Sequence, residues 1–136
     1  MIGKHFSEED FSCSCCGLHI VDEKLLKMLD DLETYLTIWF EKDCTILIKS
    51  EGAGHCTVRC EKQNKKIGGV DNSRHLPKFH LIGEGACDMH VKEISIKELH
   101  NITKKLWDGN EILTGGLGFY GWGVHIDGSS KRFWEG

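Results

Sequence analysis

The sequence predicts an α+β fold, in which helices pack on one face of a small, mainly antiparallel sheet and leave the other face for a functional site. Two segments carry apolar residues at the three- and four-residue spacing of amphipathic helices, and short strand-like segments lie between and after them. Helices and hairpins are thus segregated along the chain. Its 136 residues fit one ordinary domain, so we expect a single domain over residues 1–136.

The composition argues against several classes of protein. Hydrophobic residues make up 40% of the chain, but no apolar run approaches the roughly 18 to 20 residues of a membrane helix, so we expect no membrane insertion. A formal charge of −4 and the lack of a dense Lys/Arg stretch argue against a nucleic-acid partner. The first residues, MIGKHFSEEDF, lack the apolar core of a signal peptide, so we expect the protein in the cytoplasm before any release or delivery.

The N-terminal part of the chain predicts two helices. Ser7 precedes three acidic residues, which suits a short capped helix because acids favour the positive end of the helix dipole. Asp22 can cap a longer helix. The apolar face of that helix carries Leu25, Leu29, Leu32, Leu36 and Trp39.

The middle of the chain predicts strands around a long loop. Residues 44–49, CTILIK, are β-prone, whereas residues 50–74 are polar, Gly-rich and without a helical period. Long segments of this kind in small domains are often functional. Residues 85–91 alternate, so that Asp88 and His90 share one face of a strand.

The last part of the chain predicts one helix and a hairpin. Ser95 opens a Ser-x-x-Glu capping box, and the apolar period that follows it ends at Gly109. In the segment GGLGFYGWGVHIDG, two short strands around Gly121 would place His125 and Asp127 on the same face.

Three side chains could form a catalytic metal site. Such a site needs about three nitrogen, oxygen or sulfur ligands and an open position for water. His75, Asp88 and His125 lie on segments that a small sheet could bring together. Each residue taken singly is more often an ordinary core or surface residue than a ligand.

Several motifs occur together and in a fixed order. They comprise Phe11, Cys13 and Cys15, then Arg59, Cys60 and Asn64, then Ser73 with His75, then Ala86 with Asp88, and last Gly116, Gly118, Tyr120, Val124, His125, Asp127, Arg132 and Trp134. Through nearly its full length the chain resembles the family of zinc D-Ala-D-Ala carboxypeptidases and phage endolysins. Those metallopeptidases cut peptidoglycan stem peptides in the bacterial cell wall.

The resemblance implies a cofactor, a substrate and a set of site residues. His75, Asp88 and His125 would hold one Zn²⁺, and Arg59 and Ser73 would bind the substrate, with the guanidinium gripping a carboxylate. The substrate would be a peptidoglycan stem peptide, cut at its terminal D-Ala or internally. Pocket shape would decide which bond is cut.

The spacing departs from the family at the first histidine. Twelve residues separate His75 from Asp88, which is more than usual, and His80 competes for the ligand role. We favour His75 because Ser73 stands two places before it.

The catalytic base is a second departure. Some relatives carry a Glu three places before the last histidine, where this chain has Trp122. We expect zinc to polarise the scissile carbonyl and activate water, and Asp127 to move the proton or to orient His125. If the missing Glu means lost catalysis, the chain is instead a non-catalytic zinc-binding recognition or structural module.

Seven cysteines cannot all pair within one chain. In a reducing compartment they would be structural or metal-binding thiols. Cys13, Cys15, Cys16 and His19 could form a second, structural zinc site, and small buried thiols in a tight loop are the alternative. A thiol redox or metal-storage protein would leave the His and Asp motifs unexplained.

Overall fold

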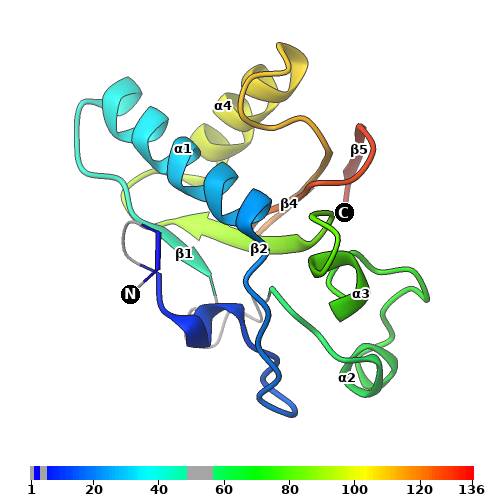
Figure 1. The fold of residues 1–136 in the computed structure, drawn as a ribbon. Coiled ribbons are helices and arrows are strands. Elements are labelled where there is room, and N and C mark those ends of the chain that lie inside the picture. Colours follow the sequence, from blue (N-terminus) through cyan, green and yellow to red (C-terminus); the bar gives the residue numbers. More distant parts are fainter. Residues whose placement is uncertain (1, 4–5, 49–56) are drawn as a thin grey trace.

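The computed structural model describes residues 2–3, 6–48 and 57–136, and its architecture is α+β as predicted (Figure 1). A 3₁₀ turn, Glu8–Phe11, precedes the main elements. In chain order these are α1 (Glu23–Phe40), β1 (Ile46–Ile48), α2 (Glu61–Lys66), α3 (Pro77–His80), β2 (Ala86–Val91), α4 (Ile96–Asp108), β3 (Gly116–Tyr120), β4 (Gly123–Asp127) and β5 (Arg132–Glu135).

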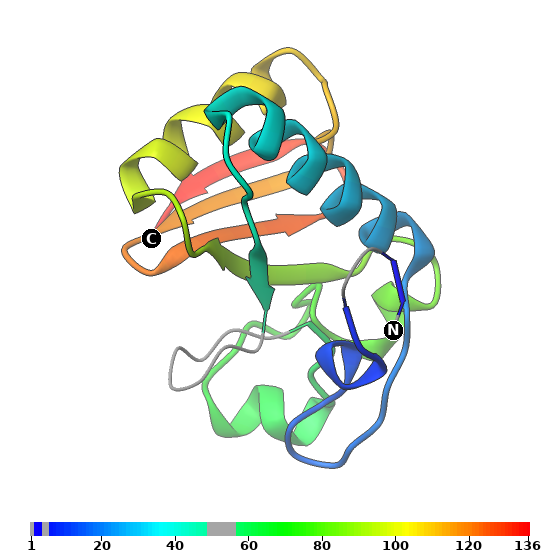
Figure 2. The same ribbon diagram turned by 90° about the vertical axis from the view of Figure 1, so that its left-hand side faces the viewer.

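The five strands form one sheet in the order β1-β2-β4-β3-β5. Every neighbouring pair is antiparallel except β3 and β5, which run parallel. Helices α1 and α4 lie together over one face of this sheet, and α2 lies on the opposite side from them (Figure 2). In this strand order β2 and β4 are neighbours, and neither is an edge strand.

Both long helices begin at the caps that the sequence predicts. Asp22 accepts hydrogen bonds from the backbone N–H groups of Lys24 and Leu25, and its other oxygen accepts from Gly85, just before β2. The start of α1 is thus tied to the start of a central strand. Ser95 and Glu98 form the reciprocal capping box that opens α4.

The core lies between these two helices and the sheet. Leucines of α1 and α4 pack on the strand residues that alternate away from the site, among them Cys87, Met89, Val124 and Ile126. The alternation in β2 then sends Asp88 to the opposite face. The same rule in β4 sends His125 and Asp127 to that face.

The prediction of a helix-free segment from 50 to 74 is wrong. The helix α2 lies within it, capped by the Cys60 thiol, which accepts from the backbone N–H of Gln63. Its six residues, EKQNKK, contain no apolar side chain, so they carry no hydrophobic period. The strand expected at 44–49 is Ile46–Ile48, with Lys49 outside the described residues, as are residues 50–56. The short strand β5 was not predicted, because four residues give too little alternation to recognise.

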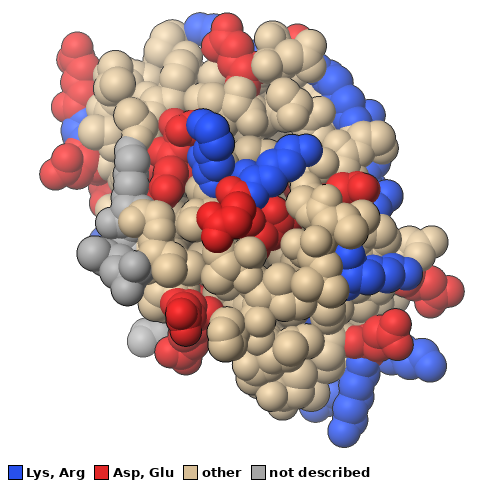
Figure 3. Space-filling model, viewed as in Figure 1, with Lys and Arg blue, Asp and Glu red and all other residues tan. Residues whose placement is uncertain are grey.

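The surface carries charges of both signs. In Figure 3 acidic and basic side chains are interspersed over the face drawn, without a broad patch of either sign. No helix within the described part of the chain combines the length and apolar character that crossing a bilayer requires.

Candidate active site

The side chains of His75, Asp88 and His125 meet on the sheet face away from α1 and α4. One ligand atom from each lies within 4.8 Å of the other two. Asp88 in β2 and His125 in β4 are direct cross-strand partners, and His75 comes from the turn before α3. Adjacent antiparallel strands therefore supply two of the three groups.

The orientation of the His75 ring is fixed by a backbone acceptor. Its Nδ1 donates to the Thr57 carbonyl at 2.8 Å, while its Nε2 lies 3.2 Å from Asp88 Oδ1. Because Nδ1 carries the proton in that arrangement, the lone pair of Nε2 points towards Asp88. A histidine held in this way is prepared to bind a cation.

His125 is fixed in the same manner by a carboxylate. Its Nε2 lies 3.0 Å from Asp127 Oδ2, and its Nδ1 lies 3.1 Å from Asp88 Oδ1. The bond to Asp127 places the ring proton on Nε2 and leaves the Nδ1 lone pair facing Asp88. The two imidazoles meet edge to face, with 5.1 Å between ring centroids.

The three groups suit a zinc ion. Two imidazole lone pairs and a carboxylate oxygen converge, and a cation or a proton must lie among them to offset their repulsion. Burial raises the pKa of Asp88, but positive charge and ring N–H groups on His75 and His125, present when both rings are protonated, outweigh that effect and hold the pKa well below its usual range. Two nitrogens and one oxygen, with space on one side, form a donor set typical of catalytic zinc.

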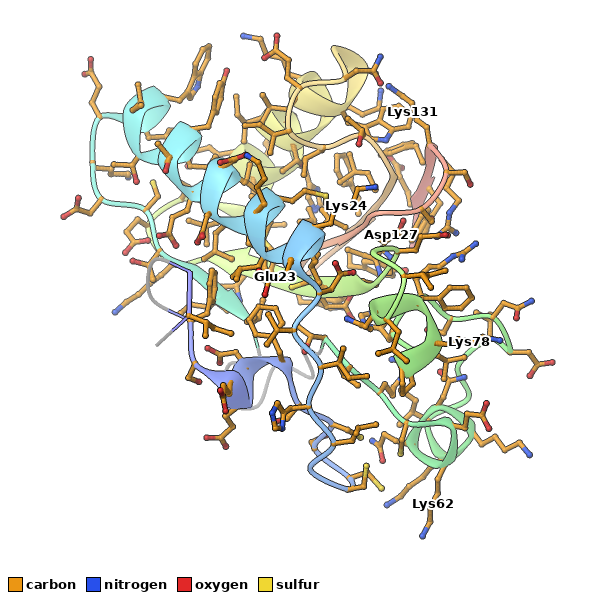
Figure 4. All side chains as sticks on the ribbon, in the orientation of Figure 1. Glu23, Lys24, Lys62, Lys78, Asp127 and Lys131 are labelled. Carbon is orange, nitrogen blue, oxygen red and sulfur yellow. The ribbon has the colours of Figure 1, made fainter. Side chains whose placement is uncertain are left out.

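Asp127 is completely buried and fully hydrogen-bonded. Oδ1 accepts from the Gly116 backbone N–H at 2.9 Å and from both the backbone N–H and the hydroxyl of Ser129, at 3.0 and 2.6 Å. Oδ2 accepts from Arg132 at 2.7 Å as well as from His125. Burial raises its pKa, but these hydrogen bonds outweigh burial and lower the pKa overall. Figure 4 labels Asp127 at the end of β4.

A cavity of about 440 Å³ opens beside the three groups. Three arginines lie in its wall, so the cavity favours an anionic ligand. Of the described residues that line it, Asp88 is the one carboxylate. The lining comprises Arg59, Val70, Asn72, Ser73, Arg74, His75, Asp88, Tyr120, Trp122, His125, Arg132 and Trp134.

Arg59 is held in place by two side chains. Its Nε donates to Asn64 Oδ1 at 3.0 Å, and its Nη2 donates to Ser73 Oγ at 2.8 Å. Asn64 is buried and donates in turn to the Val70 carbonyl. The backbone N–H of Arg59 donates to the His75 carbonyl at 2.8 Å, so the guanidinium and the first histidine are linked through the main chain.

Aromatic side chains form the other wall of the cavity. Trp134 donates its indole N–H to the Tyr120 hydroxyl at 2.8 Å, and its ring lies 5.0 Å from that of His125. Tyr120 stacks on Trp122 with 4.8 Å between centroids. A Cβ at Gly118 would lie only 2.4 Å from the Trp134 ring, so glycine there allows the indole to lie against β3.

A comparison of the sequence with known protein families agrees with this arrangement of side chains. A model of the peptidase M15 family matches residues 4–127, a range that contains all three converging groups. The chain belongs to the peptidase M15 family. No curated protein and no solved structure matches it. M15 peptidases are zinc-dependent, so the protein is classed as a metallopeptidase of a family that acts on peptidoglycan.

The competing histidine of this M15 peptidase lies outside the cluster. His80 is buried in α3, and neither ring nitrogen has a hydrogen-bond partner among the described residues. Burial, aided by the proximity of His75, lowers the pKa of His80 to about 4, so the ring is neutral at pH 7. A Cβ at Gly85 would lie 2.4 Å from the imidazole, so that glycine makes room for it.

The peptidase also brings together cysteines from two distant segments. Cys13, Cys16 and Cys60 have sulfur atoms within 4.8 Å of one another, and the exposed Cys15 directly precedes Cys16 on the same turn. Burial raises the pKa of Cys13, but backbone hydrogen bonds from Cys60, Cys16 and Cys15 lower it to about 7 overall. His19 is not part of this group.

Several contributors to the site carry no sequence signal of their own. The Thr57 carbonyl is a backbone group in the long loop, and backbone acceptors of this kind cannot be recognised from residue type. Arg59 and Asn64 belong to one of the motifs noted in the sequence, but their contact depends on the first turn of α2, which was not predicted.

Proposed function

We propose that this M15 peptidase is a zinc enzyme that hydrolyses peptide bonds in peptidoglycan stem peptides, as a D-Ala-D-Ala carboxypeptidase or an endopeptidase. The observation that carries the proposal is the convergence of His75, Asp88 and His125, with the second nitrogen of each imidazole already bound to an acceptor. The arginine-lined cavity beside them and the family match support it.

The metal would be held by His75 Nε2, Asp88 Oδ1 and His125 Nδ1. Zinc supplies Lewis-acid chemistry at such a site, since it polarises a carbonyl and makes water a nucleophile near neutral pH. Two second-sphere groups, the Thr57 carbonyl and the Asp127 carboxylate, keep both rings in the required tautomer.

Arg59 would bind the substrate carboxylate. Asn64 accepts from its Nε and Ser73 accepts from its Nη2, and the planar guanidinium held by these two contacts lines the cavity. Ser73 lines the same wall, and we assign it the task of fixing Arg59 beside the substrate. A pre-positioned guanidinium loses little entropy when a carboxylate binds.

Asp127 would act through His125. All of its acceptor capacity is used by neighbours, and its lowered pKa makes it a weak base, so we favour orientation of His125 over proton transfer. The Tyr120 hydroxyl accepts from Trp134, which leaves its own proton available to a substrate oxygen in the cavity. We propose Tyr120 as a hydrogen-bond donor to the carbonyl under attack.

A second candidate function is peptide recognition without hydrolysis. One observation favours it, because the described lining of the cavity contains no carboxylate besides Asp88 that could serve as general base. The zinc site would then orient a bound peptide.

The deciding experiment uses two matched stem peptides, one with a free C-terminal carboxylate and one with a C-terminal amide. The zinc-loaded protein is incubated with each, and products are identified by mass spectrometry. Release of terminal D-Ala from the free acid alone supports the carboxypeptidase, and internal cleavage of both supports the endopeptidase. Binding of either peptide without any product would overturn hydrolysis and favour recognition.

A further inference from the structure

We propose that Cys13, Cys15, Cys16 and Cys60 form a second metal site, which binds a zinc-class ion and fastens the N-terminal segment to the start of α2. This proposal is separate from the proposed hydrolysis, because it concerns different residues and a different part of the molecule.

The geometry of the sulfur atoms carries the proposal. Three thiols, from Cys13, Cys16 and Cys60, have sulfur atoms within 4.8 Å of one another, which is close enough to surround one ion. The exposed Cys15 stands on the same turn, directly before Cys16, and is available as a fourth ligand. Four thiolates in a tetrahedral arrangement are the usual donor set of a structural zinc site.

The backbone around the N-terminal cysteines forms a tight, hydrogen-bonded turn. The N–H of Cys13 donates to the Leu18 carbonyl at 2.7 Å, and the N–H of Gly17 donates to the Cys13 carbonyl at 2.9 Å. Gly17 has a φ of 75°, which closes the turn without a side-chain penalty. Cys13, Cys15 and Cys16 therefore project from one compact turn.

Backbone amides also point at the sulfur atoms. The N–H of Cys60 lies 3.4 Å from Cys13 Sγ, and the N–H of Gln63 lies 3.4 Å from Cys60 Sγ. Hydrogen bonds of this kind stabilise a thiolate and orient it, as second-sphere groups do around metal ligands. The cluster thus has outer partners as well as ligands.

The ion would join an exposed turn to a short polar helix, and neither of these two pieces buries much apolar surface of its own. Residues 14–19 are exposed, and α2 presents only Asn64 as a buried side chain. Figure 4 labels Lys62 projecting outward from α2, on the side away from α1. With so little apolar burial available in either segment, a metal ion would supply much of the free energy that holds them together.

The segment fastened in this way carries two groups of the active site. Thr57, whose carbonyl accepts from His75, is bound through its hydroxyl to the Asp10 carbonyl at 2.7 Å. Arg59 directly precedes Cys60. The segment from Thr57 to Cys60 is thus anchored at its first residue by Asp10. A metal bound at Cys60 would anchor it at its last residue.

The first test is the metal content of the reduced, full-length protein. The parent should hold two metal ions per chain. Cys16→Ser and His125→Ala should each hold one, and the double variant none. Cys44→Ala is the matched control, because Cys44 is a buried core thiol outside the cluster, and it should still hold two. One ion in the parent, unchanged in Cys16→Ser, would overturn the proposal.

The second test replaces zinc with cobalt and does not depend on activity. Thiolate ligands give Co²⁺ an intense near-ultraviolet charge-transfer band, which nitrogen and oxygen ligands do not. The band should persist in His125→Ala and be lost in Cys16→Ser with the fold intact by circular dichroism. Its absence from the reduced parent, or its persistence in Cys16→Ser, would overturn the proposal, as would recovery of the four cysteines as disulfides under reducing conditions.

Discussion

The candidate metal site on the sheet and the cysteine cluster differ in what holds their residues in place. Asp88 and His125 stand on adjacent strands whose other faces are buried in the core. The cysteines stand on an exposed turn and at the cap of a six-residue polar helix. The residues of the first site are therefore positioned by the packed sheet, whereas those of the second lie on an exposed turn and a short helix that contribute little to the core.

If both sites bind metal as proposed, the ion has a different role in each. A site on rigid strands exists before the ion arrives, so the ion adds chemistry. A site on loops is completed by the ion, so the ion adds structure. Removing metal with a chelator should therefore loosen the N-terminal segment and leave the sheet in place.

The largest expected effect comes from His125→Ala. Loss of one ligand should remove the metal from the sheet site and lower kcat/KM by about 10³-fold or more, which corresponds to several kcal/mol of lost transition-state stabilisation. Steady-state hydrolysis and metal analysis measure both. A variant that lacks the metal but keeps parental activity would contradict the assignment.

The next effect comes from Arg59→Gln. Loss of the charge-assisted contact to a substrate carboxylate, worth about 1.5–3 kcal/mol, should lower kcat/KM by about 10–100-fold, mainly through KM. The metal content should not change. The control is Arg74→Gln, which pairs with Glu84 and should have a smaller effect. An equal loss of kcat/KM in both variants would contradict a specific contact between Arg59 and the substrate carboxylate, and would indicate that the arginines act only through their overall positive charge.

Asp127→Asn should weaken the metal site without emptying it at high zinc. An outer-sphere partner of a histidine ligand typically contributes 10–100-fold in metal affinity. Competition with a chromogenic chelator measures that affinity. If Asp127 instead transferred the proton, activity at saturating zinc would collapse and its pH profile would shift, while metal affinity would stay near that of the parent.

Cys16→Ser should have a smaller effect on catalysis. Arg59 remains held by Asn64 and Ser73, so we expect KM to rise by less than about tenfold and kcat to stay near the parental value. Hydrogen exchange of residues 57–66 should become faster in this variant. Unchanged exchange there would contradict the fastening role.

The smallest effect on activity at neutral pH is expected for His80→Leu, which instead changes the pH dependence of stability. The unfolded ring binds a proton below its ordinary pKa of 6.5, whereas the folded ring stays neutral down to about 4. The parent should therefore lose up to roughly 3 kcal/mol as the pH falls through that window. The free energy of unfolding in urea is measured at both ends of this pH window. It should change less with pH in His80→Leu than in the parent, whereas the control His19→Ala, at an exposed position, should behave like the parent.

The sequence predicts the regular parts of the fold well. Helices α1 and α4 have capping residues and long apolar periods, and β2 alternates cleanly. The short elements α2, α3 and β5 contain too few residues for a period to emerge. The choice of His75 over His80 as a candidate rested on neighbouring residues, and the structure brings His75 into the cluster.

The supporting groups of both sites could not be predicted, for two physical reasons. Backbone acceptors such as the Thr57 carbonyl have no residue identity to recognise. The approach of Cys60 to Cys13 joins positions 47 apart, and nothing local to either segment encodes such a contact. The sequence grouped Cys13 with His19, whereas the folded chain groups it with Cys60.

The cross-strand pairing of Asp88 with His125 also governs when the protein can acquire activity. The two residues are 37 positions apart, with α4 and β3 between them. Contacts over such separations are costly in loop entropy and form late in folding. A partly folded or still-growing chain therefore offers metal no complete set of ligands. The proposed metal site is therefore incomplete until β4 has docked beside β2, so hydrolysis would begin only after this part of the sheet has assembled.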